Sequence, residues 1–91
     1  MKQLTRIVAT AERQLHIWER HRITLAEVEG ACFAKPLLVR GREGCHVVFG
    51  QTEAGRFLYV VVVMMSRGRA RLVTAREMMP KEHRFYQRRG K

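Results

Sequence analysis

The stretch FLYVVVVMM, residues 57–65, decides how this chain folds. It places four consecutive valines after two aromatic residues and a leucine, and it contains no charged residue. Branched and aromatic residues of this kind favour strands, and the run is far shorter than the ~18 apolar residues of a membrane helix. An uninterrupted apolar run of this length is typical of a strand that is buried on both faces. We therefore expect residues 57–65 to form the centre of a sheet.

Three further strands are expected around this one. LLVRG (37–41) and CHVVFGQT (45–52) precede it, and RARLVTAR (69–76) follows it. SRG, residues 66–68, supplies a hairpin turn between the central strand and the last one. Simple alternation along the last strand puts one set of residues on a common face: Ala70, Leu72, Thr74 and Arg76. Short turns between all four strands predict an antiparallel sheet.

Two helices are expected before the sheet. The first covers residues 11–21, with Thr10 as its N-cap and with Ala11, Leu15 and Trp18 as its apolar stripe. The second begins after Thr24, because Glu27 stands three residues later and completes a capping box, and Pro36 closes it.

A third helix is expected after the sheet. It begins at Pro80, which suits a first turn, and reaches about Arg89. The sequence shows no repeat and no Gly/Ser/Pro linker, so residues 1–91 are expected to be a single domain. The predicted fold class is α+β, with N-terminal helices packed on a four-stranded antiparallel sheet and a C-terminal helix.

Composition indicates a polyanionic partner. The net charge is +10, and residues 54–91 carry ten Lys and Arg against two Glu, which is +8 of that total. Such a concentration attracts nucleic acid or an acidic protein, although a solvated basic face without a ligand has the same composition. The N-terminal segment is broken by polar residues and lacks the apolar core of a signal peptide, so we expect a cytosolic protein without a membrane segment.

No metal site or other cofactor is expected. The sequence contains no Asp and no Asn, and its eight Glu are scattered, which disfavours a magnesium cluster. Cys32 and Cys45 are too few for a structural zinc site and are expected to be reduced packing residues.

The C-terminal helix holds a candidate catalytic group. Glu82 and His83 each lie within a helical turn of Tyr86, and Arg76 ends the preceding strand. A carboxylate, an imidazole, a phenol and a guanidinium are what metal-free RNA cleavage needs for proton transfer and for charge on the phosphate. The spacing is equally compatible with Glu82 pairing with an arginine and with Tyr86 packing its ring on the sheet.

Other candidates lie outside this helix. His21, at the end of the first helix, is a weaker candidate for the same pocket. Arg56 follows Gly55 out of a turn and can reach either a phosphate or a carboxylate. The remaining arginines expected to attract RNA are Arg67, Arg69, Arg71, Arg84 and Arg88.

Four short segments, in order, are similar to those of a known family. RHRIT with EVE after it, GQTEAGRFLYVVV, RLVTAREM and KEHRFY resemble the patterns of the BrnT family, the toxin half of a bacterial type II toxin–antitoxin pair. In this resemblance the family's K-H corresponds to Arg20 and His21, its G-R to Gly55 and Arg56, its S-A-R to residues 74–76, and its E-R-x-x-Y to Glu82 and Tyr86. The chain departs from the family at Arg22, Thr74 and His83, where the family has glycine, serine and arginine.

The resemblance implies a RelE-like fold and a metal-independent ribonuclease. It implies that a cognate antitoxin binds the toxin and represses its own promoter, so that contact with DNA is only indirect. Cleavage would then use attack by the 2′-hydroxyl, with phosphate bound by Arg56 and Arg76. Proton transfer would fall to a pair among His21, Glu82, His83 and Tyr86. The alternative is a non-catalytic basic module that binds nucleic acid or an acidic protein.

Overall fold

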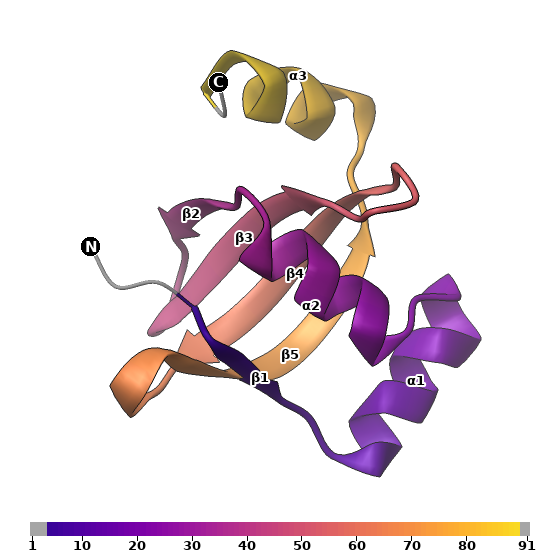
Figure 1. Cartoon of the computed structure of the whole chain (residues 1–91), viewed down its shortest axis with the longest axis vertical. Helices are drawn as coiled ribbons and strands as arrows, with labels where there is room; N and C mark the ends of the chain where they lie inside the picture. Colours follow the sequence, from indigo (N-terminus) through magenta and orange to yellow (C-terminus); the bar gives the residue numbers. More distant parts are fainter. Residues whose placement is uncertain (1–3, 90–91) are drawn as a thin grey trace.

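The computed structural model describes residues 4–89. Its elements follow one another in the order β1 (Arg6–Val8), α1 (Ala11–His21), α2 (Leu25–Phe33), β2 (Leu37–Arg40), β3 (Cys45–Gln51), β4 (Phe57–Met64), the short 3-10 turn η1 (Ser66–Gly68), β5 (Arg69–Glu77) and α3 (Pro80–Arg89). The strands form one sheet in the order β1-β5-β4-β3-β2, shown in Figure 1. No helix within residues 4–89 is long and apolar enough to cross a membrane.

The β4 strand lies at the centre of the sheet, as predicted. Its residues Leu58, Val60 and Val62 are fully buried on the face that α1 and α2 cover. They form the core there together with Ile17 of α1 and Val28 of α2. The residues that alternate with them on β4 are only half-buried. The prediction that this strand is buried on both faces is therefore correct for one face only.

Four antiparallel strands were expected, and the sheet has five. The predicted strands pair in the order β2-β3-β4-β5, all antiparallel. The additional strand, β1, pairs with β5 in parallel, with Ile7 beside Ala70. A strand of three residues within a polar segment gives little sequence signal, and its partner lies about sixty residues further along the chain. The sheet is therefore mixed rather than purely antiparallel.

A β-bulge in β5 changes the face on which Arg76 lies. Val61 pairs with Thr74 but Val62 pairs with Leu72, so Val73 is an extra residue without a partner in β4. Beyond the bulge it is Ala75 that is buried with Ala70 and Leu72. The prediction that Thr74 and Arg76 share their face is wrong, because one inserted residue reverses the alternation. Arg76 instead lies on the face opposite α1 and α2, which we call the outer face.

The predicted helices and their N-caps are confirmed. The Thr10 side chain accepts a hydrogen bond from the Arg13 N–H, and Thr24 and Glu27 form both bonds of the capping box. The apolar stripe predicted for α1 is wrong: Ile17 is its buried residue, whereas Leu15 and Trp18 are 56% and 42% exposed. The side of α1 that is buried depends on how the helix packs on β5. The spacing of apolar residues within the helix carries no information about that packing.

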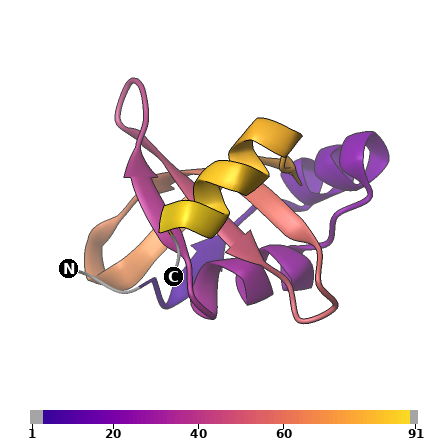
Figure 2. The same ribbon diagram turned by 90° about the horizontal axis from the view of Figure 1, so that it is seen from above.

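The α3 helix lies across one end of the outer face (Figure 2). The ring of Phe85 packs on Phe49 of β3, with ring centroids 5.3 Å apart, and His83 lies on Phe57 of β4. Pro80 opens the helix, as predicted. This position brings the polar side chains of α3 to the end of β5.

Gly50 marks the closest approach between the sheet and α2. A Cβ atom on Gly50 would overlap the backbone carbonyl group of Ala31. Both residues are fully buried, and Ala31 lies on the buried face of α2. Only glycine therefore allows β3 and α2 to pack at this distance.

Candidate functional site

Arg76 and Glu82 form a two-pronged ion pair at the end of β5. Nη1 and Nη2 of Arg76 each donate to one carboxylate oxygen of Glu82, both at 2.8 Å. The backbone N–H of Met79 donates to the same carboxylate, also at 2.8 Å. Glu82 thus caps the start of α3 and ties that helix to the sheet through Arg76.

The guanidinium of Arg76 lies on the face of the Tyr59 ring. The two residues are partners in the β4–β5 register, and the Arg76 guanidinium carbon lies 3.9 Å from the centroid of the Tyr59 ring. Phe49 meets the same ring edge-on, with centroids 5.4 Å apart. Arg76 is therefore held on two sides. Sequence reasoning missed Tyr59, because the register of the hairpin pairs Tyr59 with Arg76 only after the shift that the bulge introduces.

His83 lies against Phe57, with ring centroids 3.9 Å apart. Its Nε2 atom is buried and has no hydrogen-bond partner among the described residues. His83 also lines an open hollow of about 260 Å³, together with Arg56, Phe57 and Glu77. Because its imidazole lines the same hollow as the guanidinium of Arg56, His83 is the residue of this group best suited to proton transfer.

Tyr86 also contacts Phe57. Its ring meets Phe57 with centroids 6.1 Å apart, and its hydroxyl donates to the backbone carbonyl of Lys35 at 3.3 Å. It lines a separate hollow of about 610 Å³ beside the end of α2. The ring packs on the sheet, and the hydroxyl is held by backbone rather than by Arg76 or Glu82.

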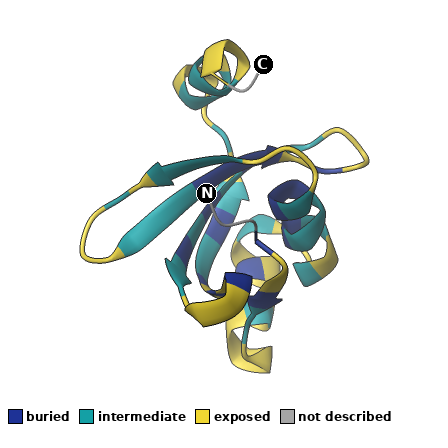
Figure 3. Cartoon of the chain, turned by 60° about the vertical axis from the view of Figure 1, so that its left-hand side comes forward, coloured by how far each residue is buried: buried dark blue, intermediate teal, exposed yellow. Residues whose placement is uncertain are grey.

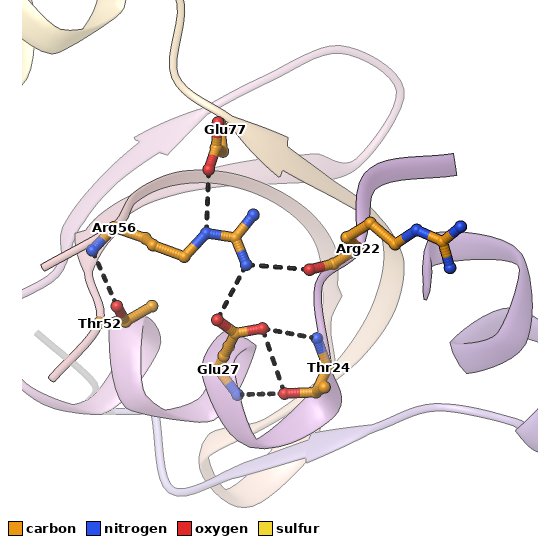
Figure 4. Close-up of polar contacts among 6 residues, drawn as sticks. All are labelled: Arg22, Thr24, Glu27, Thr52, Arg56 and Glu77. Carbon is orange, nitrogen blue, oxygen red and sulfur yellow. Dashed lines mark hydrogen bonds and ion pairs between the residues drawn. The ribbon is translucent and has the colours of Figure 1, made fainter. Parts of the chain in front are cut away.

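Arg56 joins three parts of the chain (Figure 4). Its Nε donates to Glu77 of β5 and its Nη1 to Glu27 of α2, both at 2.9 Å. Nη1 also donates to the backbone carbonyl of Arg22, at 2.9 Å. Of the two ligands expected for Arg56, phosphate or carboxylate, the structure shows the carboxylate. Nη2 of Arg56 has no partner within residues 4–89 and is free to receive an anion.

The structure brings together part of the predicted site and leaves the rest apart. Arg76 and Glu82 pair at the end of β5, and His83 and Tyr86 of the same helix both contact Phe57. His21, the last residue of α1, forms no hydrogen bond or ion pair with any of these residues. Arg71 precedes Arg76 by five strand residues, about 16 Å, so the arginines near the start of β5 (Arg67, Arg69 and Arg71) lie at the other end of that strand. Arg84 and Arg88 are exposed on α3.

Glu82 and Glu27, two of the three carboxylates that pair with an arginine, are held in the ionised form. The hydrogen bonds from Arg76 lower the pKa of Glu82 and outweigh its partial burial. The backbone N–H of Thr24, and then Arg56, lower the pKa of Glu27. A carboxylate with a lowered pKa is a poor general acid near neutral pH. Glu82 is therefore best suited to orient Arg76, and not to donate a proton.

The Glu82–Arg76 pair predicts a loss of stability in acid. Because the pKa of Glu82 is lower in the folded than in the unfolded protein, its contribution is complete above the unfolded value and disappears as the pH falls through the folded one. We expect the free energy of unfolding to fall less between about pH 7 and about pH 3 in Glu82→Gln than in the parent, measured by urea titration. Glu19→Gln, at an exposed position of α1, should keep the parental fall. An equal fall in Glu82→Gln would contradict the proposed ion pair.

The arrangement of elements defines the class of fold. Helices that pack on one face of a mainly antiparallel sheet, with a further helix after the last strand, form an α+β, RelE-like fold.

Within that class, the chain is similar to the crystal structure of the Brucella abortus ribonuclease toxin BrnT. The TM-score is 0.69, and the match covers 82% of this chain and 97% of that chain, at 9% sequence identity. The predicted likeness to BrnT is thus confirmed for the fold. No protein-family model matches this sequence, and no curated protein matches it.

Proposed function

We propose that this protein is a ribonuclease toxin of a bacterial type II toxin–antitoxin system, acting in the cytoplasm. Two findings support the proposal: the fold of the BrnT ribonuclease toxin, and a strongly basic chain with +10 net charge. The observation that carries it is the guanidinium of Arg76, which Glu82 and Tyr59 fix at the end of the sheet where α3 also places His83 on Phe57. The partners are an RNA substrate and a cognate antitoxin, and DNA is reached only through the antitoxin.

The proposed reaction is attack by the 2′-hydroxyl on the neighbouring phosphate. His83 takes the hydroxyl proton, the 2′-oxygen bonds to phosphorus, and the bond to the 5′-oxygen breaks. The leaving oxygen takes up a proton, from Tyr86 or His21, the two remaining candidates. The products are a 2′,3′-cyclic phosphate and a 5′-hydroxyl. No oxidant, reductant or metal enters this scheme.

The arginines stabilise the negative charge on the phosphate. The Nη2 of Arg56 and the Nε of Arg76 have no partner among the described residues, so each offers a donor while its carboxylate partner stays in place. Preorganised donors of this kind contribute most where their orientation is already fixed. Glu82 and Tyr59 provide that orientation for Arg76.

A non-catalytic basic module is the second candidate. It is favoured by one observation: both arginines expected to bind phosphate are already paired with carboxylates. Such a module would bind RNA in a salt-dependent way and would not cut it.

Incubation of total RNA with the purified chain in excess EDTA separates the two candidates. We expect fragments on a denaturing gel from the parent and from His16→Phe, a control at an exposed histidine of α1. The variant His83→Phe keeps a ring on Phe57 but has no proton to transfer, and RNA should stay intact with it. Intact RNA with the parent, with only a shift in a native gel, would support the binding module instead.

A further inference from the structure

Part of the outer face of the sheet is apolar and uncovered. Val39, Val47, Val61 and Val63 lie on it and are half-buried; we call them the valine patch. Three of them form one row across the sheet, since Val39 pairs with Val47 and Val47 with Val61. In the next row, Phe49 is covered by Phe85 of α3. Figure 3 shows α3 over one end of the sheet, and among the described residues no second helix packs on this side.

An apolar outer face is unusual in a sheet of this kind. An antiparallel sheet with helices on one face normally carries polar residues on the other. The outward positions of β4 are instead Phe57, Tyr59, Val61 and Val63, and Met65 follows at 36% exposed. The sequence of β4 is that of a strand covered on both sides, whereas the described chain covers only one end of its outer face.

Three exposed arginines border the valine patch. Arg6 pairs with Arg69 in the register, and Arg71 pairs with Val63, so all three lie on the outer face. We call them the arginine rim. Within residues 4–89 none of them forms an ion pair, in contrast to Arg56 and Arg76. An apolar strip with unpaired cations along one side matches a ligand that is apolar on one face and acidic at its edge.

We propose that the valine patch and the arginine rim bind an acidic protein segment whose apolar side chains cover the patch. A protein is favoured over single-stranded RNA because bases need aromatic side chains for stacking, and the patch and rim contain none. The proposal deepens the proposed function, on which it rests for the identity of the partner: an antitoxin segment placed here would cover Arg69 and Arg71, two of the arginines proposed to attract RNA.

Synthetic peptides test the proposal on the intact protein. The probe is a labelled peptide of alternating leucine and glutamate, about ten residues long, read by fluorescence anisotropy. Two control peptides alternate leucine with lysine and serine with glutamate. We expect the leucine–glutamate peptide to bind at least about tenfold more tightly than either control, because only it has both the charge and the apolar face.

Variants of the protein locate the binding face. Val61→Thr/Val63→Thr keeps the shape and strand preference of the side chains, and Arg69→Gln/Arg71→Gln removes two charges of the rim. Each should weaken binding of the leucine–glutamate peptide about tenfold or more. Leu15→Thr, at another exposed apolar position, should not. Thermal unfolding shows that each variant is folded.

Three outcomes would overturn the proposal. In the first, the serine–glutamate peptide binds as tightly as the leucine–glutamate peptide, so that charge alone acts. In the second, the valine variant binds as tightly as the parent. In the third, the valine variant weakens binding of a single-stranded RNA oligonucleotide and not of the peptide. Failure of RNA cleavage in EDTA would remove the ribonuclease function but would leave a positive peptide result standing, so the two failures can be told apart.

Discussion

Replacement of Arg76 by alanine is expected to lower the rate of RNA cleavage by about 100-fold or more, the usual effect of removing one fixed donor to a reacting oxyanion. Arg76 is the guanidinium that Glu82 and Tyr59 hold in place. Arg76→Lys should recover little of the lost rate, because an ammonium cannot make the two parallel bonds to Glu82. Initial rates on a labelled RNA in excess EDTA would measure both effects.

The same substitution affects stability, and this effect has to be separated from the first. Arg76→Ala leaves the Glu82 carboxylate without its partner in a site where that side chain is only 22% exposed. In the double variant Arg76→Ala/Glu82→Gln no unpaired charge remains, so stability should partly recover while cleavage stays lost. Recovery of cleavage along with stability would mean that Arg76 only holds α3 in place.

Gly50→Ala is expected to produce the largest loss of stability. Its Cβ would overlap the backbone of Ala31, which cannot move aside as the end of a flexible side chain can. Overpacking of this kind commonly costs about 1–3 kcal/mol, and a clash with backbone belongs at or above the upper end. Urea unfolding monitored by circular dichroism would give the change directly.

Gly30→Ala is the matched control. Gly30 lies on α2 one residue before Ala31, and a Cβ there would meet nothing within 4 Å. Alanine in a helix interior is favoured over glycine by about 0.5–1 kcal/mol, so this variant should be more stable than the parent. If Gly50→Ala is as stable as the parent, β3 and α2 do not approach each other as closely as the contact of Gly50 with Ala31 requires.

The local parts of the fold could be predicted from sequence. Thr24 and Glu27 define the start of α2, the four valines define the central strand, and Pro80 opens α3. Each of these signals acts between residues that are close in the chain or through a composition that only one environment favours. The features that were missed depend on tertiary packing: the parallel pairing of β1 with β5, and the burial of Ile17 in place of Leu15 and Trp18.

The candidate site shows the same division. Helical spacing predicted that Glu82 and His83 lie near Tyr86, and the structure places all three on α3. The bulge at Val73 could not be predicted from the alternation, yet it turns Arg76 toward Glu82 and Tyr59. The carboxylate partners of Arg56 also come from distant segments, α2 and the end of β5. The residues of the site could therefore be predicted from the sequence, but the partner of each residue could not.

The measurement that tests the central claim most directly is the chemistry of the cleaved ends. A labelled RNA would be incubated with the purified protein in excess EDTA, beside the same strand carrying 2′-O-methyl groups. We predict fragments that end in a 2′,3′-cyclic phosphate from the unmodified strand, and no cleavage of the methylated strand. Cleavage of the methylated strand, or an unmodified strand that stays intact, would contradict a metal-free ribonuclease that uses the 2′-hydroxyl.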